Sequence, residues 1–307
     1  MQKNILITGA SSGLGKETAL KLAEEGYKVF AGVRKQADKE ALENLNPNIT
    51  VVFLDITSDE SVNGAFEEIS KYTNELFALV NNAGIVLAGP VEYIPIELLK
   101  QQFDVNVFGA IRVAQKFLPL LSKKDSRIVN ISSMASYGIF PFVSPYCVSK
   151  RSLDMFFNSL LLETKENNLK IISIKPGVVR TPIWDKSLEV CEKNMEFLCE
   201  EGKKKYEKEF AFLTQNAKKN NEKGLLPKDV ANAVLKATLY DNKQNNLYTN
   251  TVRATPVYAD IIFNICKMFE QSIDYDIKEG FTKSIVDSKE RTKEYRKDSA
   301  MGIHHGM

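Results

Sequence analysis

The sequence predicts an α/β fold built on one doubly wound, parallel β-sheet, and three observations support this prediction. Short apolar runs rich in β-branched residues alternate along the chain with segments whose apolar residues recur at helical spacing. The first of these runs leads directly into a glycine-rich turn and a helical segment. The chain of 307 residues, 44% apolar and 26% charged, is long enough for one domain with a substantial core.

The expected strands cover residues 4–8, 27–33, 50–54, 77–81, 127–131, 170–175 and 247–249. The expected helices lie between them, at residues 16–25, 39–45, 58–72, 96–121, 144–163 and 228–239. Such alternation implies a parallel sheet covered by helices on both faces, with ligands bound beyond the carboxyl ends of the strands. We therefore predict a single-domain Rossmann-like fold of about seven strands over residues 1–282, followed by a charged and mobile tail at 283–307.

The glycine-rich turn reads Gly9-Ala-Ser-Ser-Gly-Leu-Gly15 and joins the first strand to the first helix. This order presents a helix N-terminus and free backbone N–H groups to a pyrophosphate, with glycines where a Cβ would obstruct the approach. The spacing Gly-x-x-x-Gly-x-Gly departs from the commoner Gly-x-Gly-x-x-Gly fingerprint, so the generic dinucleotide motif does not strictly match.

The second expected strand ends in a basic residue, because Val33 is followed by Arg34. In dinucleotide folds an acid at this point binds both ribose hydroxyls, whereas a cation accommodates a 2′-phosphate. Arg34 therefore favours NADP(H) over NAD(H); the alternative is that Arg34 is a solvated loop cation.

Tyr146 and Lys150 stand four residues apart within an expected helix and so share one of its faces. A nearby ammonium favours the ionised form of a phenol, which would let Tyr146 exchange protons nearer neutrality. Taken alone, the pair is more typical of a lysine stem packed on an exposed ring than of a catalytic pair.

Bulk properties argue against several classes of function. A net charge of +2 with interspersed acids and bases does not favour nucleic-acid binding. The four cysteines lack Cys-x-x-Cys spacing and the two histidines, His304 and His305, are at the end of the chain, so we expect neither a disulfide framework nor a metal site. The first strand begins too early for a signal peptide, and no apolar run reaches the ~20 residues that cross a bilayer. We expect a cytoplasmic protein with no transmembrane segment, and a membrane-surface role for the amphipathic stretch 252–269 stays as a further hypothesis.

The segment 183–226 carries apolar residues at helical steps, with Leu188, Met195, Tyr206 and Phe210 among them. It predicts two amphipathic helices, which either form an enlarged lid over a hydrophobic substrate or pack on the domain or a partner subunit. Helix 144–163 is apolar around more than one stripe, so we expect a homodimer or homotetramer built on it and on helix 96–121.

These motifs together resemble the short-chain dehydrogenase/reductase family. Thr8–Gly15 matches the cofactor turn of that family, Asn81–Gly84 its central strand motif and Tyr146-x-x-x-Lys150 its catalytic pair. The resemblance covers residues 3–182 and the motifs follow the family's order.

Two further residues complete the resemblance: Ser133 lies thirteen residues before Tyr146, and Asn106 stands in the Asn-x-x-Gly pattern of the long helix. By resemblance, Tyr146 is the general acid in ketone reduction and the base in alcohol oxidation. Lys150 lowers the pKa of Tyr146 and holds the nicotinamide ribose, Ser133 binds the substrate oxygen, and Asn106 anchors a water that links Lys150 to solvent. The alternatives are that Ser133 only closes its strand and Asn106 only binds local backbone.

The resemblance also implies cofactor contacts: Ser12 and Arg34 to the adenosine phosphate, Asp55 to adenine and Thr181 to the carboxamide. The full implied cofactor-binding set is Gly9, Ser11, Ser12, Gly13, Leu14, Gly15, Arg34, Asp55, Ile56, Asn82, Ala83, Gly84, Tyr146, Lys150, Pro176, Gly177, Val179 and Thr181.

The implied function is NADP(H)-dependent interconversion of a ketone or aldehyde and an alcohol on a steroid-, retinoid- or lipid-like substrate. Within the family, the segment Ser144–Lys150 and the long region after Thr181 resemble the branch of hydroxysteroid, retinol and 3-hydroxybutyrate dehydrogenases. The competing hypothesis is a catalytically silent NADP(H)-sensing or scaffold protein on the same fold.

Overall fold

The computed structural model describes residues 2–121, 125–138, 140–164, 169–183 and 198–239. The chain divides into two compact units, Met1–Tyr258 and Ala259–Met307, and every described residue belongs to the first. The expected seventh strand at 247–249, the stretch 252–269 and the charged tail lie outside the described residues, so the domain boundary at residue 282 stays a prediction.

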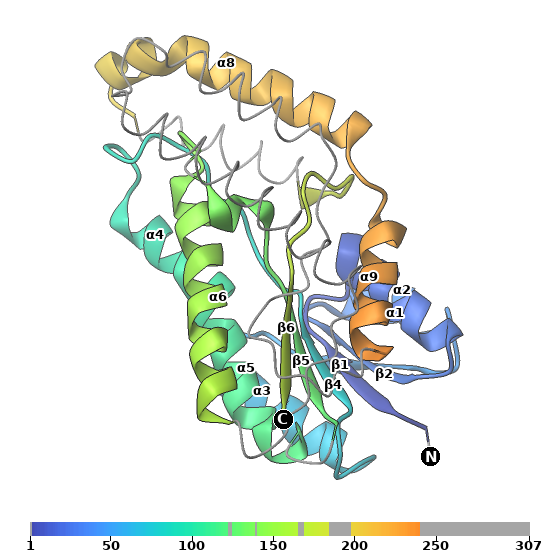
Figure 1. Ribbon diagram of the computed structural model, residues 1–307. Coiled ribbons are helices and arrows are strands. Elements are labelled where there is room, and N and C mark those ends of the chain that lie inside the picture. Colours follow the sequence, from blue (N-terminus) through green and yellow to red (C-terminus); the bar gives the residue numbers. More distant parts are fainter. Residues whose placement is uncertain (1, 122–124, 139, 165–168, 184–197, 240–307) are drawn as a thin grey trace, which may run out of the picture. The chain divides into compact units, whose positions relative to one another are not determined.

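Six parallel strands form one sheet in the order β3-β2-β1-β4-β5-β6 (Figure 1). Their bounds are β1 Asn4–Ile7, β2 Lys28–Val33, β3 Ile49–Phe53, β4 Ala78–Asn81, β5 Arg127–Ile131 and β6 Lys170–Ile174. The order reverses between β1 and β4, so the carboxyl ends of these two strands form the switch point where ligands bind in such sheets. The six expected strands before residue 175 are all present, which confirms the doubly wound α/β prediction.

Helices cover both faces of the sheet (Figure 1). On one side lie α1 (Gly13–Glu24), α2 (Gln36–Glu43) and α9 (Pro227–Leu239), and on the other α3 (Asp59–Ser70), α5 (Ala110–Phe117) and α6 (Ser144–Glu163). Alternation along β1 shows the reason: Ile5 and Ile7 join one core cluster and Leu6 joins the other. Both clusters are buried, so each face of the sheet is a core layer.

The expected long helix 96–121 is interrupted. It consists of α4 (Ile96–Phe103), a π-helical turn η1 (Asp104–Gly109), α5 and a 3₁₀ turn η2 (Leu118–Leu121). A Cβ on Gly109 would lie 2.7 Å from Ile56 Cδ1, so this glycine lets the π-turn approach the loop after β3. The helical apolar period does not reveal the extra residue of a π-turn, which is why the sequence predicts a continuous helix.

The second of the two expected amphipathic helices is α8 (Glu200–Lys223), and most of the first lies outside the described residues. The Tyr206 ring of α8 meets Phe142 edge to face at 5.4 Å and Tyr93 at 6.3 Å between centroids. Phe210 packs on Phe142 as well, at 6.1 Å. The apolar face of α8 therefore packs on the domain itself, at the loop that leads into α6.

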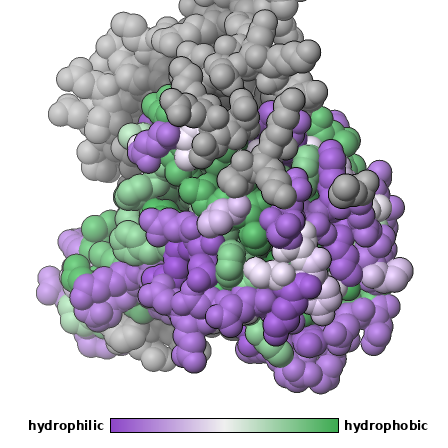
Figure 2. Space-filling view, turned by 90° about the horizontal axis from the view of Figure 1, so that it is seen from below, coloured by the Kyte–Doolittle hydropathy of each residue, from purple (hydrophilic) through white to green (hydrophobic). Residues whose placement is uncertain are grey.

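The surface seen from below in Figure 2 consists mostly of hydrophilic residues, with hydrophobic ones interspersed. Within the part of the chain that the structure describes, no helix combines the length and the apolar character that crossing a bilayer requires.

Candidate active site

The glycine turn after β1 is packed too closely for larger residues. Gly9 has φ +67°, and a Cβ there would lie 2.9 Å from Ala83 Cα. Gly15 leaves no room for a Cβ against the Gly9 carbonyl oxygen, and a Cβ on Gly13 (φ +53°) would lie 3.3 Å from Thr181 Cβ. The turn thus brings three segments implied in cofactor binding together at the N-terminus of α1.

Thr8 and Asn82 tie this turn to the end of β4. Thr8 Oγ1 accepts hydrogen bonds from the backbone N–H groups of Asn82 and Ala83, each at 3.0 Å. In return, Asn82 Nδ2 donates to the carbonyl oxygens of Thr8 (2.9 Å) and Gly9 (3.0 Å). These four bonds cross the switch point of the sheet, and they explain why a threonine directly follows the first strand.

Asn106 lies in the π-turn η1 and is 1% exposed. Its Oδ1 accepts from Ile85 N (2.8 Å), while its Nδ2 donates to Ile85 O (2.9 Å) and to Ser149 Oγ (3.0 Å). Ser149 in turn donates to the carbonyl oxygen of Tyr146 at 2.8 Å. Asn106 therefore does bind local backbone, but it also connects β4 to the helix that carries Tyr146 and Lys150.

Lys150 is buried, and its ammonium donates to the carbonyl oxygen of Ile131 at 2.8 Å. Its Nζ lies 5.8 Å from the centroid of the Tyr146 ring. A Cβ on Gly84 would come within 3.4 Å of Lys150 Nζ and 3.3 Å of Asn106 Oδ1. Asn106 and Lys150 therefore both border Gly84, in the segment that follows β4.

Ser133 follows β5 and caps the short 3₁₀ helix η3 (Met134–Tyr137), where its Oγ accepts from Ala135 N at 3.1 Å. A hydrogen bond also joins the side chains of Ser133 and Tyr146. The serine thus serves both the local turn and the phenol.

Protonation in the site differs from the expectation in one respect. Burial is the largest effect on Tyr146 and raises its pKa to about 12, although the Ser133 hydrogen bond acts in the opposite direction. Burial is also the largest effect on Lys150 and lowers its pKa to about 8, although the Asp154 carboxylate acts to raise it. The expected lowering of the Tyr146 pKa by Lys150 is absent here, because the ammonium is bound to Ile131 and burial dominates at the phenol.

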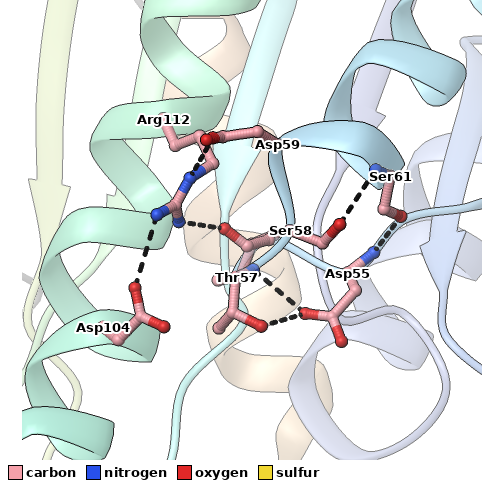
Figure 3. A network of polar contacts seen from close by, with 8 residues as sticks. Asp55, Thr57, Ser58, Asp59, Ser61, Asp104 and Arg112 are labelled. Atoms are coloured by element: carbon pink, nitrogen blue, oxygen red, sulfur yellow. Dashed lines mark hydrogen bonds and ion pairs between the residues drawn. The ribbon is translucent and has the colours of Figure 1, made fainter.

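Asp55 lies just beyond β3 in a polar network (Figure 3). Its Oδ1 accepts from Thr57 N (3.0 Å) and Thr57 Oγ1 (2.7 Å), and its own N–H donates to Ser61 Oγ (2.8 Å). Burial opposes ionisation, but the Thr57 hydrogen bonds and the charges of Arg34 and Arg112 outweigh it and hold the pKa of Asp55 below its ordinary value. Asp55 is therefore an ionised acceptor, and Arg34 lies exposed within its electrostatic reach.

Arg112 of α5 was not anticipated from the sequence. Its guanidinium donates to Asp59 Oδ1 (2.6 Å) and to Asp104 Oδ1 (3.4 Å), as Figure 3 shows, and also to the carbonyl oxygen of Ile56 (2.6 Å). Because Asp104 opens the π-turn that holds Asn106, Arg112 joins the Asp55–Asp59 loop to that turn. The sequence shows here only an arginine within an expected helix, and that signal is not specific.

The segment after β6 closes the site on the other side. The carbonyl oxygen of Pro176 accepts from Met134 N at 3.0 Å, which places it beside η3. Val179 forms a parallel bridge with Leu225, and Thr181 is 9% exposed against Gly13. Gly177, directly after Pro176, is partly exposed.

The residues present fit a dinucleotide. A helix N-terminus, glycines whose Cβ positions are blocked and an ionised Asp55 all lie at the carboxyl edge of the sheet. Among the described residues, no group of three His, Cys, Asp or Glu side chains is placed to hold a metal ion. Fold and site fit a nicotinamide-dependent oxidoreductase.

Comparison with known proteins agrees with this class. The profile of the short chain dehydrogenase family matches residues 3–191. The NADPH-dependent 3-dehydrocapnine reductase of Ornithobacterium rhinotracheale is 38% identical over 191 residues, which are 59% of this chain and 67% of that protein. Estradiol 17-beta-dehydrogenase 2 of Rattus norvegicus is 36% identical over 198 residues, 60% of this chain and 52% of that protein. The structure of ElxO with NADP bound matches with a TM-score of 0.64 and 26% identity over 82% of this chain and 96% of that one.

The chain belongs to the short chain dehydrogenase family. It is an NAD(P)-dependent dehydrogenase or reductase that acts on CH–OH groups and the corresponding carbonyls.

Proposed function

We propose that this protein is an NADP(H)-dependent carbonyl reductase and alcohol dehydrogenase acting on a hydrophobic substrate. The observation that carries the proposal is the convergence of Asn106, Ser133, Tyr146 and Lys150 at the end of β4, beside the glycine turn. A cofactor bound there supplies the hydride.

The chain's own residues would do the rest of the chemistry. The Tyr146 hydroxyl, kept protonated by burial, is suited to give its proton to a carbonyl oxygen as negative charge develops there. Ser133 would donate to the same oxygen, and Lys150 would hold the ribose with its ammonium. Asn106 fixes the backbone of Ile85 next to Lys150, where it would anchor the water that returns protons from solvent.

The preference for NADP(H) rests on Arg34, the exposed cation directly after β2. A guanidinium suits a 2′-phosphate, and β2 is not followed by the acid that binds unmodified ribose. Two relatives named above, the NADPH-dependent reductase and ElxO with NADP bound, support this preference.

A hydrophobic substrate is supported by the aromatic side chains that gather at the N-terminus of α6. Phe142, four residues before Tyr146, packs against Tyr206 and Phe210 of α8. The same contacts that hold α8 on the domain would let α8 serve as a lid whose inner side is apolar.

A homo-oligomer is supported by apolar side chains left exposed on α6 and on the adjoining π-turn. Val148, Met155 and Leu162 recur at seven-residue intervals on α6 and are more than half exposed, and Phe108 is 49% exposed. Size-exclusion chromatography with light scattering is expected to give a dimer or tetramer; a monomer at micromolar concentration would contradict this part of the proposal.

The proposal is tested by comparing NADPH and NADH in a thermal-shift assay and then measuring NADPH oxidation against steroid, retinoid and short aliphatic carbonyls. We expect NADPH to raise the melting temperature more than NADH and at least one hydrophobic carbonyl to be reduced. Tyr146→Phe is the matched control, because it keeps the ring and the cofactor contacts while removing the proton donor. It is expected to bind NADPH and to lose about 10²–10⁴-fold in turnover.

A further inference from the structure

Asp154 lies one helical turn after Lys150 on α6, and both side chains are buried, with 3% and 4% exposure. Its Oδ2 is 2.7 Å from the Nζ of Lys175, the residue that directly follows β6. The side chains of both members of this ion pair are 4% exposed. Asp154 therefore pairs directly with one buried ammonium, that of Lys175, and acts on a second, that of Lys150, through its charge.

A buried ammonium needs a compensating charge, because desolvation strongly disfavours its ionised form. The acceptor that Lys150 Nζ has in the structure, the carbonyl oxygen of Ile131, carries no net charge. Asp154 Oδ1 accepts no hydrogen bond from any residue that the structure describes, so its charge is not taken up elsewhere. The carboxylate is thus the source of negative charge for both lysines.

Other titratable groups on neighbouring elements are engaged elsewhere or are neutral near pH 7. On α4 and η1, which pack against α6, Glu97 pairs with Lys100 and Asp104 with Arg112. Tyr137 of η3 places its ring 3.9 Å from Lys175 Nζ.

Tyr146 and Cys147, on α6 itself, are both kept protonated by burial, which raises the pKa of the phenol to about 12 and of the thiol to about 11. Asp154 is therefore the acid that offsets the charge of Lys150 among the described residues packed there.

We propose that Asp154 is a positioning residue that keeps the Lys150 ammonium charged in its buried site, and that Lys175 limits this effect by competing for the same carboxylate. The inference rests on the proposed role of Lys150. Since Lys175 immediately precedes Pro176, the pair also links the catalytic helix to the segment implied in cofactor binding.

The two partners act on Lys150 with opposite sign. The pKa of Lys150, about 8, is the net result of burial, which lowers it, and of Asp154, which raises it, so loss of the carboxylate lowers this pKa further. Loss of the Lys175 ammonium frees the carboxylate for Lys150 and removes a like charge, so it raises the pKa of Lys150. A pair that served only to hold α6 and β6 together would weaken folding in both variants and would shift neither titration.

The experiment follows the ε-methylene signal of Lys150 by NMR on protein with isotope-labelled lysine between pH 6 and pH 11, with Lys150→Met identifying the signal. Asp154→Asn is expected to lower the midpoint by about one unit or more, and Lys175→Met to raise it. Asp154→Glu is expected to restore most of the midpoint, and the double variant Asp154→Asn/Lys175→Met to lie between the single variants.

An unmoved midpoint in folded Asp154→Asn, or a midpoint that falls in Lys175→Met, overturns the proposal. Because removal of one partner from a buried ion pair is destabilising, folding is checked by thermal melting. If Asp154→Asn does not fold, the test uses Lys175→Met, whose Lys150 midpoint is expected to rise, and the double variant, whose midpoint is expected to be lower than that of Lys175→Met. The titration needs neither cofactor nor substrate, so its failure is distinct from a failure of the proposed reductase activity.

Discussion

The Asn106 side chain hydrogen-bonds to both backbone groups of Ile85: its Oδ1 accepts from the N–H at 2.8 Å and its Nδ2 donates to the carbonyl oxygen at 2.9 Å. The segment that follows β4 therefore has its backbone hydrogen bonds to this side chain and not to a neighbouring strand. These bonds hold the backbone next to Gly84 close to Lys150, and a third hydrogen bond, to Ser149, connects the same amide to α6. A displacement of Asn106 would therefore shift both the backbone of Ile85 and the helix α6 that carries Tyr146 and Lys150.

Asn106→Ala is expected to lower the free energy of unfolding by about 2–4 kcal/mol, because three hydrogen bonds of about 0.5–1.5 kcal/mol each are lost. Turnover is expected to fall by about 10²-fold, as for other small misplacements of reacting groups. Denaturant unfolding and steady-state kinetics measure the two effects.

Gln102→Ala is the matched control for this prediction. Gln102 is also buried and binds the same segment, donating to Ile85 O and accepting from Leu87 N, each at 2.7 Å, but it does not border the space beside Gly84. It is expected to cost stability with a much smaller loss of turnover. Equal losses of turnover in both variants would show that Asn106 acts only through stability.

Ser133→Ala is expected to shift the pH profile as well as the rate. Ser133 lowers the raised pKa of Tyr146, so its removal raises that pKa further. Alcohol oxidation needs the ionised phenol, so its rising limb is expected to move to higher pH, and carbonyl reduction is expected to slow by about 10²–10³-fold through the lost donor.

Ser136→Ala is the control, since Ser136 is buried in the same η3 turn and its hydroxyl has no hydrogen-bond partner among the described residues. An unchanged profile in Ser133→Ala, or an equal shift in Ser136→Ala, would contradict the assigned role of Ser133.

The site residues visible in the sequence are those whose chemistry is encoded in short motifs. Gly9, Asn82 and Tyr146 stand in local patterns whose spacing is fixed by one turn or one helical face, so their neighbourhood could be inferred without the structure. Asp154 and Lys175 could not, because their pairing depends on how α6 packs beside β6. The available sequence signal was a lysine directly after the apolar end of an expected strand, and such a signal is not specific.

The interruption of the long helix escaped prediction for a similar reason. Apolar residues at three and four steps continue through Asp104–Gly109, and the π-turn follows from tertiary contacts of Asn106 and Gly109. The fold class depends on patterns repeated over many elements and was accurate; the local geometry at Asn106 depends on single contacts.

Gly9→Ala is expected to disrupt the cofactor turn. An alanine at φ +67° costs about 1–2 kcal/mol from its backbone conformation alone, and its Cβ would also press against Ala83 Cα at 2.9 Å. Gly26→Ala separates the two effects, because Gly26 also has positive φ (+85°) but nothing lies within 4 Å of its Cβ position. We expect both variants to have a lower melting temperature. Only Gly9→Ala is expected to bind NADPH at least tenfold more weakly, as measured by calorimetric titration. Equal NADPH affinities of the two variants would show that the turn tolerates the added methyl group.

Arg34→Asp is expected to reverse the cofactor preference. Arg34 is exposed directly after β2, so the substitution leaves the core intact, removes a donor to the 2′-phosphate and adds an acceptor for ribose hydroxyls. A charge-assisted hydrogen bond of about 1.5–3 kcal/mol corresponds to a roughly 10–100-fold loss of NADPH affinity, with NADH affinity kept or improved. Dissociation constants for both cofactors measure the ratio, and Lys35→Gln, which removes the neighbouring exposed cation, is expected to leave it within a few-fold of wild type. If Arg34→Asp still prefers NADPH, or if Lys35→Gln changes the ratio as strongly, the discrimination lies elsewhere than at Arg34.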